Sequence, residues 1–347
     1  MKYSIIIPIY NASRYISGIV NNILQQKYRD FELLLIDDGS KDDSLSVCQS
    51  IAAVDSRVVV VSQENGGPSK ARNAGLNNAQ GEYVLFADAD DEFQENFLEQ
   101  IDCYVRKTDC DVYCYGYLTV RNDYRGRIDM VPEERIYKNR QEILSSVDRI
   151  TDSFWFNVVY DKVYKRSLIE GNRLRFDETI YLGEDRKFCL ELLKYCSSWH
   201  FIPLSLYVYK IQNSESISAK CDLNNYVQGK EVQQLYNKIL TMSLLPEDIV
   251  LVKSNYEQIR VCISHMMQVF RSDMRHKYSY IKSVYEDNKI ADSHVSLDPL
   301  SSSEKKLTYR LWVRGNAFFV YIYAWMLFFY KYKAKLYKEN EKKYENH

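Results

Sequence analysis

Short apolar runs alternate with amphipathic stretches over the first 120 residues, and this alternation restricts the chain to one fold class. The runs that predict strands fall at residues 4–9, 31–36, 58–61, 82–87 and 112–117, with stretches of helical spacing between them. Strands and helices that alternate at this spacing form βαβ units. The sequence therefore predicts an α/β protein with a mostly parallel sheet and helices on both faces.

A polar cluster follows each of the first four predicted strands. The clusters are residues 10–11 (YN), 37–40 (DDGS), 63–67 (QENGG) and 88–91 (DADD). Any one of them alone is ordinary turn chemistry. Because ligands of parallel sheets bind beyond the carboxyl ends of the strands, four clusters at one edge predict a binding site there.

The fourth cluster places Asp88, Asp90 and Asp91 directly after an apolar run. Crowded carboxylates raise one another's pKa unless a cation lies among them. The hard oxygen donors of Asp88 and Asp90 suit Mg²⁺ or Mn²⁺ shared with a phosphate group. The alternative is a solvated turn in which Asp91 caps a following helix.

Composition excludes several other classes of function. The chain has 347 residues and a formal net charge of -1, which argues against a nucleic-acid partner. Its five His are scattered and its eight Cys form no Cys-x-x-Cys pair, so we expect neither a zinc site nor a disulfide framework. No phosphate-binding loop or dinucleotide fingerprint occurs. The first apolar run is too short for a signal peptide, which predicts a cytoplasmic protein.

Taken together, the motifs resemble the signature series of family-two glycosyltransferases, which have the GT-A fold. The matching segments are residues 7–11 (IPIYN), 37–40 (DDGS), 65–75 (NGGPSKARNAG) and 88–91 (DADD). A second block, from residues 161–166 to the GED at 183–185, resembles the acceptor side of that family. A third, at residues 207–218, resembles bacterial capsule and cell-wall members. The likeness covers about residues 1–220, which implies a catalytic domain with donor binding in 1–120 and the acceptor side in 121–220.

The resemblance implies a role for each matched residue. The nucleotide-sugar donor would be held by Pro8, Tyr10, Asp38, Arg72 and Asp88. In this scheme Tyr10 stacks on the base, Asp38 hydrogen-bonds the base or ribose, and Asp88 contacts the ribose. Arg72 faces the nucleotide.

The remaining matched residues would serve the chemistry. Asp90 reaches a Mn²⁺ or Mg²⁺ ion on the diphosphate, since the departing nucleoside diphosphate needs a cation. Asp185 is the general base for the acceptor hydroxyl, with Glu184 as its neighbour. The alternative for Glu184 and Asp185 is that acids in a first helical turn simply stabilise the helix dipole.

The C-terminal third lies outside this resemblance. Residues 221–300 read as a helical region, and residues 301–347 as an aromatic and basic C-terminal helix. Residues 317–330 are apolar throughout and precede four lysines, but they fall short of the roughly 20 residues of a spanning helix. This predicts a helix on the inner face of the membrane. The alternatives are a helix buried on the catalytic domain and an interface of a homo-oligomer.

These observations predict a metal-dependent, inverting glycosyltransferase. It would transfer a sugar from a UDP-sugar to a lipid-linked surface glycan in polysaccharide biosynthesis. Two alternatives stay open: a sugar nucleotidyltransferase on a similar sheet, and a scaffold or glycan-binding protein of the same fold. Residues 10–13 (YNAS) stand where nucleotidyltransferases carry a Gly-rich basic loop, and Asp88, Asp90 and Asp185 are all present, which argues against both.

Overall fold

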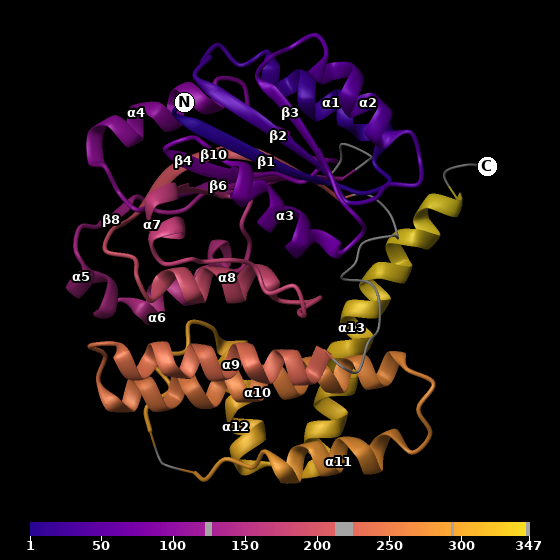
Figure 1. The fold of residues 1–347 in the computed structure, drawn as a ribbon. Coiled ribbons are helices and arrows are strands. Elements are labelled where there is room, and N and C mark those ends of the chain that lie inside the picture. The colour runs from indigo at the N-terminus through magenta and orange to yellow at the C-terminus, as the bar shows by residue number, and fades with distance from the viewer. Residues whose placement is uncertain (122–126, 212–224, 293–294, 345–347) are drawn as a thin grey trace. The chain divides into compact units, whose positions relative to one another are not determined.

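The chain folds into two compact units. The computed structural model describes residues 1–121, 127–211, 225–292 and 295–344. The N-terminal unit comprises residues 1–216 and 242–244, and the C-terminal unit comprises residues 217–241 and 245–347. Figure 1 shows a sheet with flanking helices in the first unit and packed helices in the second. The strands of the sheet all lie in the first unit.

Four parallel strands form the half of the sheet that positions the polar clusters. β1 (Tyr3–Ile9), β2 (Phe31–Asp37), β3 (Val58–Ser62) and β4 (Tyr83–Phe86) lie in the order β3-β2-β1-β4. β2 is buried along its whole length, as expected of an interior strand. The chain winds outward from β1 to β3 and then returns to the other side of β1 with β4. Such a switch point opens a crevice between the carboxyl ends of the two strands.

Helices cover both faces of this half-sheet, which confirms the α/β class. α1 (Ser13–Leu24) and α4 (Phe97–Thr108) lie on one side and α3 (Gly67–Asn78) lies on the other (Figure 1). Ile5 of β1 and Ile16 of α1 are fully buried in one shared core. On the other face, α3 approaches β1 so closely that a Cβ on Gly75 would stand 2.3 Å from Ile6 Cγ2. Only a glycine fits there.

Beyond β4 the sheet becomes mixed. β9 (Lys162–Lys165) pairs antiparallel with both β4 and β6 (Val112–Arg121), so a later strand separates β4 from the strand expected at 112–117. β10 (Trp199–Ile211) pairs parallel with β6 and antiparallel with β5 (Glu92–Phe93). The remaining elements of this unit are α2 (Ser44–Ala52), β7 (Arg127–Met130), β8 (Arg135–Tyr137), α5 (Arg140–Leu144), α6 (Val147–Asp152), the 3₁₀ helix η1 (Phe154–Asn157), α7 (Arg166–Gly171) and α8 (Glu184–Leu193).

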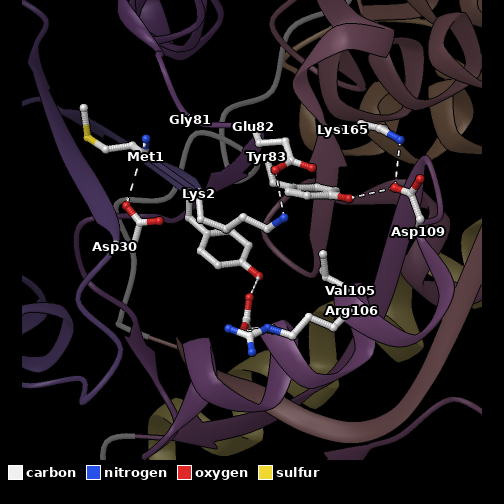
Figure 2. A network of polar contacts seen from close by, with 12 residues as sticks. Met1, Lys2, Asp30, Gly81, Glu82, Tyr83, Val105, Arg106, Asp109 and Lys165 are labelled. Carbon is white, nitrogen blue, oxygen red and sulfur yellow. Dashed lines mark hydrogen bonds and ion pairs between the residues drawn. The ribbon is translucent and has the colours of Figure 1, made fainter.

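Polar contacts join the strands at the edge opposite the carboxyl ends of β1 and β4 (Figure 2). Lys2 Nζ lies 2.8 Å from the Glu82 carboxylate. The Tyr83 hydroxyl donates to Asp109 at 3.2 Å, and Lys165 Nζ lies 2.8 Å from the same carboxylate. Partly exposed ion pairs contribute about 0–1 kcal/mol each. They therefore align strand ends, while burial of the apolar core supplies most of the stability.

Five helices make up the described part of the C-terminal unit: α9 (Asn225–Met242), α10 (Glu247–Arg271), α11 (Lys277–Asp287), α12 (Ser303–Arg314) and α13 (Ala317–Tyr344). Met266 of α10, Trp312 of α12 and Ala324 of α13 are buried in one core. The buried stripes of α12 and α13 thus have partners within the unit. The division of this part of the chain at residue 300 stays a prediction.

Gly39 lets the loops after β2 and β3 come together at the carboxyl edge. Its φ of +69° is a conformation that side chains with a Cβ rarely adopt. A Cβ at this position would also lie 2.8 Å from the backbone nitrogen of Asn65. Any side chain would therefore strain the turn and push the two loops apart.

We predict that Gly39→Ala lowers the free energy of unfolding by about 1–3 kcal/mol, because it combines a positive φ with a backbone clash. Urea denaturation would measure the change. Gly18→Ala is the matched control, since a Cβ there meets nothing within 4 Å and the residue lies inside α1. The control should be neutral or gain up to about 1 kcal/mol. A Gly39 variant as stable as the wild type would contradict the prediction.

Candidate functional site

The loops after β1 and β2 are joined by hydrogen bonds at the carboxyl edge of the sheet. The Ser40 hydroxyl accepts the Asn11 N–H at 3.1 Å, and the Asn11 side-chain oxygen accepts the Lys41 N–H at 2.8 Å. Tyr10 keeps 48% of its surface exposed, beside the half-buried Pro8 of β1. The aromatic face of Tyr10 is thus accessible to a planar ligand at the switch point.

Asp38 joins the loop after β2 to the loop after β3. Its carboxylate accepts hydrogen bonds from the side chains of Gln63 at 2.7 Å and Asn65 at 3.1 Å. It also accepts the backbone N–H groups of Gly66 at 2.9 Å and Gly67 at 2.7 Å. Both oxygens are therefore engaged within the protein, and Asp38 positions the start of α3. Its contact with a base or ribose stays a prediction.

Arg72 brings together the acidic groups of two distant segments. The guanidinium lies 3.0 Å from Asp185, 3.5 Å from Glu184 and 3.4 Å from Asp88. Arg72 is only 6% exposed. Burial opposes its charge, but the three carboxylates outweigh this and raise the pKa of Arg72. That Arg72 faces a nucleotide stays a prediction. In the structure Arg72 connects Asp88, the expected ribose contact, to Asp185, the expected general base, and its neighbour Glu184.

An aromatic cluster and one amide hold this arrangement. Phe176 packs under Arg72, with the guanidinium carbon 5.4 Å from the ring centre, and stacks on Phe188 of α8 at 4.2 Å. The Asn73 side chain donates to the Phe176 carbonyl at 2.9 Å and accepts its N–H at 2.8 Å. Successive residues of α3, Arg72 and Asn73, thereby fix the segment that leads into α8.

Asp185 has the electrostatic properties of a proton acceptor near neutral pH. Asp185 and Glu184 lie in the first turn of α8, where acidic side chains also stabilise the helix dipole. Burial, aided by the carboxylates of Glu184 and Asp88, raises the pKa of Asp185 to about 7, while Arg72 opposes the rise. A carboxylate with a pKa near the working pH suits general base catalysis. The capping function and the base function are compatible in one residue.

The acidic turn after β4 is held by β10. The Tyr207 hydroxyl donates to Asp91 at 2.8 Å and accepts the Asp88 N–H at 3.0 Å. Asp91 also accepts the backbone N–H of Lys210 at 2.8 Å. The idea that Asp91 caps a helix is wrong: it is buried, is followed by β5, and α4 begins after Asn96. Asp91 therefore fixes the acidic turn to β10.

Asp88 and Asp90 fit a cation that is shared with a ligand. Burial, followed by the charge of Asp88, raises the pKa of Asp90, and Lys210 opposes this. A divalent cation would relieve the same repulsion. Within the residues that the structure describes, no group of three His, Cys, Asp or Glu side chains could hold a metal ion. The turn could thus bind Mn²⁺ or Mg²⁺ only together with other oxygens, such as those of a diphosphate.

A buried ion pair acts electrostatically on Asp185. Lys162 of β9 and Asp161 are both fully buried and lie 2.6 Å apart. The ammonium also donates to the carbonyl groups of Trp155 and Val158. Its positive charge lowers the pKa of Asp185, although less than Arg72 does. Lys162 therefore contributes to the field in which Asp185 titrates.

Sequence reasoning missed the residues that position the site: Asn73, Tyr207, Lys210 and Lys162. Each lies within a segment that carries the family resemblance, which is the only signal that could have drawn attention to it. Nothing in the sequence shows that Tyr207 reaches Asp88 across 119 residues of chain. By contrast, Asp88, Glu184 and Asp185 were singled out individually, and the structure brings them together on Arg72.

Known proteins resemble this chain in sequence. The family described as "Glycosyl transferase family 2" matches residues 4–170. The uncharacterized glycosyltransferase EpsJ of Bacillus subtilis is 28% identical over 62% of this chain and 62% of its own length. The chain thus spans less than two thirds of EpsJ. Glycosyltransferase GlyG of Streptococcus pneumoniae is 26% identical over 82% of this chain and 92% of its own.

Solved structures share the fold. TarS 1–349 of Staphylococcus aureus in complex with UDP-GlcNAc has a TM-score of 0.61 and 22% identity, covering 82% of this chain and 84% of that one. The complex of the same protein with UDP has a TM-score of 0.64 and 21% identity, covering 96% and 92%. At this identity the likeness shows the fold alone. With the match to residues 4–170, it identifies a glycosyltransferase family 2 domain with the GT-A fold in the N-terminal part of this chain.

Proposed function

We propose that this protein transfers a sugar from a UDP-sugar to a hydroxyl group of a glycan. The observation that carries the proposal is the contact of Arg72 with Asp88 on the donor side and with Asp185 on the acceptor side. This contact links a nucleotide-binding turn to a proton acceptor at the switch point of an α/β sheet. The complexes of TarS with UDP and UDP-GlcNAc support a uridine nucleotide as donor.

The donor would lie along the carboxyl edge of β1 and β4. The exposed ring of Tyr10 offers a stacking surface for the base, and the Asp88 carboxylate, 38% exposed, can accept a ribose hydroxyl. Asp90, with Asp88, would hold Mn²⁺ or Mg²⁺ against the diphosphate. When bound, this cation would stabilise the negative charge of the departing UDP. Lys210, which offsets the acidic turn in the free protein, adds a second positive charge.

Asp185 would remove the proton of the acceptor hydroxyl as its oxygen attacks the anomeric carbon. The bond from that carbon to the diphosphate breaks while the new glycosidic bond forms. One base and no covalent intermediate suffice, so attack opposite the leaving group inverts the anomeric centre. Arg72 holds the Asp185 carboxylate in place at 3.0 Å and keeps it ionised at lower pH than burial alone would allow.

The names of proteins that this chain resembles support a choice of acceptor. Poly(ribitol-phosphate) β-N-acetylglucosaminyltransferase TarS acts, by its name, on a poly(ribitol-phosphate) polymer. We propose a lipid-linked glycan of a capsule or exopolysaccharide as the acceptor here. Such an acceptor would bring the reaction to the inner face of the membrane.

Asp185→Asn should abolish transfer without abolishing donor binding. An amide cannot accept the proton, so the rate of UDP release should fall by about 10²–10⁴-fold. Water can replace the acceptor, so slow hydrolysis of a panel of UDP-sugars would measure this loss, and calorimetry would measure donor binding. Glu191→Gln on the same helix, where Glu191 pairs with Lys194, is the matched control. Full activity of the Asp185→Asn protein would refute the role of the base.

The pH dependence of UDP release should reflect Asp185. Only the carboxylate form accepts a proton, so kcat/KM should rise with pH and level off above about 7, the pKa to which burial raises Asp185. Arg72→Met removes a charge that lowers this pKa, so the rise should move to higher pH.

Two controls make the pH experiment decisive. Arg72→Lys restores a positive charge and should return the profile toward that of the wild type. Thermal unfolding monitors whether the buried substitution still folds. A profile that stays unchanged in a folded Arg72→Met protein would show that Arg72 does not tune the base.

Asp90→Asn should remove the effect of divalent cations on donor binding. In the wild type, we expect Mn²⁺ or Mg²⁺ to strengthen UDP-sugar binding at least about tenfold over EDTA, because the cation bridges a carboxylate and the diphosphate. In the variant, the two conditions should give the same affinity. Asp30→Asn, at the opposite edge of the sheet, is the control. Equal binding with Mn²⁺ and with EDTA in the wild type would exclude a metal role for Asp90.

A further inference from the structure

One face of α13 is apolar and exposed. Its members are Phe318, Phe319, Trp325, Met326, Phe329 and Tyr330, which are 43% to 76% exposed. At about 100° per residue they fall on an arc of about 140° along the helix. This set is named the α13 apolar face. Exposed apolar surface of this extent normally marks an interaction site.

The opposite face of α13 is fixed to the C-terminal unit. Ala317, Val320 and Ala324 are at most 6% exposed and belong to the core of that unit. The Asn316 side chain accepts the N–H groups of Phe318 at 3.0 Å and Phe319 at 3.2 Å, which caps the helix start. The helix is therefore held in place by one face and presents the other as a rigid ridge.

The composition of the α13 apolar face matches the interface of a lipid bilayer. Trp325 stacks on Phe329 at 5.4 Å, and Tyr330 adds a ring with a polar tip. Trp and Tyr concentrate at the headgroup level of membranes. In the part of the chain that the structure describes, no helix is long and apolar enough to cross a membrane. Shallow insertion of one helix face is the remaining way for such a surface to meet lipid.

The charge of the following residues favours one kind of partner for this face. Residues 317–330 carry no charged side chain, and residues 331–338 (KYKAKLYK) add four lysines. Residues 339–344 (ENEKKY), in the same helix, add two lysines and two glutamates, so the basic excess remains. Anionic headgroups complement this run, with about 1 kcal/mol of attraction typical for each basic residue near the surface. A second copy of the chain would present the same basic excess, six lysines against two glutamates over residues 331–344, and so would repel rather than complement it. We infer that the α13 apolar face and the lysine run bind the surface of an anionic membrane.

The two parts of the surface act together. A single weak anchor gives marginal binding, whereas an apolar insertion combined with a basic segment gives stable attachment. Membrane binding of this kind does not depend on the identity of donor or acceptor. The membrane-binding inference can therefore be wrong while the proposed transferase activity is correct, and the transferase proposal can be wrong while membrane binding is correct.

Sedimentation of the full chain with vesicles tests the inference. We expect binding to phosphatidylcholine vesicles that contain about 30% phosphatidylglycerol, and much weaker binding to phosphatidylcholine alone. The combined variant Phe319→Ser, Trp325→Ser and Phe329→Ser should lower the partition coefficient at least about tenfold. Neutralising Lys331, Lys333, Lys335 and Lys338 to Gln should lower it by a similar factor and remove its sensitivity to about 0.5 M salt.

A matched control distinguishes binding by the α13 apolar face from nonspecific binding of exposed apolar side chains to vesicles. Val227→Ser with Leu251→Ser removes exposed apolar side chains, 62% and 41% exposed, from α9 and α10 of the same unit. This control should bind vesicles like the wild type. Circular dichroism would verify that all variants fold.

Two outcomes would overturn the inference. The first is equal binding to anionic vesicles by the wild type and the triple Ser variant. The second is a wild-type dimer, seen by light scattering, that the triple Ser substitution dissociates while neither protein binds vesicles. The latter result would assign the face to a second copy of the chain.

Discussion

The guanidinium of Arg72, buried among three carboxylates, is the interaction on which the rest of the site depends. A buried charge is costly unless it is paired, and its partners come from two distant parts of the chain. Asp88 ends the parallel half of the sheet, while Glu184 and Asp185 begin α8 on the acceptor side. Without Arg72 these acids would repel one another in a poorly solvated place. The ion cluster therefore joins the turn after β4 to the first turn of α8.

The scaffold around this cluster is built to leave it little freedom. Asn73 fixes the backbone of Phe176 next to it, and Tyr207 fixes the acidic turn from the opposite side. The Asp38 carboxylate likewise fixes the loop that leads into α3 by accepting the N–H groups of Gly66 and Gly67. Arg72 lies on that helix. Several polar side chains are thus engaged in holding loops, which preorganises the few that remain accessible for chemistry.

The sequence predicts the parallel half of the sheet well because each apolar run and each stripe is a local signal. β1 to β4 lie within one residue of the predicted apolar runs, and helices occur between them as the spacing predicted. Pairings across long stretches of chain leave no such trace. Arg72 and Asp185 are 113 residues apart, and β9 enters between β4 and β6 although it comes later in the chain. The individual acids could be chosen from motifs, whereas their common partner and the Tyr207 support required the fold.

The excess of negative charge at the carboxyl edge connects donor binding with pH. Five carboxyl groups face Arg72 or follow β4, namely those of Asp88, Asp90, Asp91, Glu184 and Asp185. Three cations lie nearby, but two of them, Lys162 and Lys210, also pair with the further carboxylates of Asp161 and Glu92. Burial raises the pKa of Asp90, Asp91 and Asp185, so these groups release their protons less readily than free carboxyl groups do. A diphosphate would add further negative charge, and a cation that accompanies it would favour the ionised form of Asp90. In the proposed mechanism, cation-assisted donor binding and proton removal by Asp185 would therefore both require ionised carboxylates at this edge of the sheet.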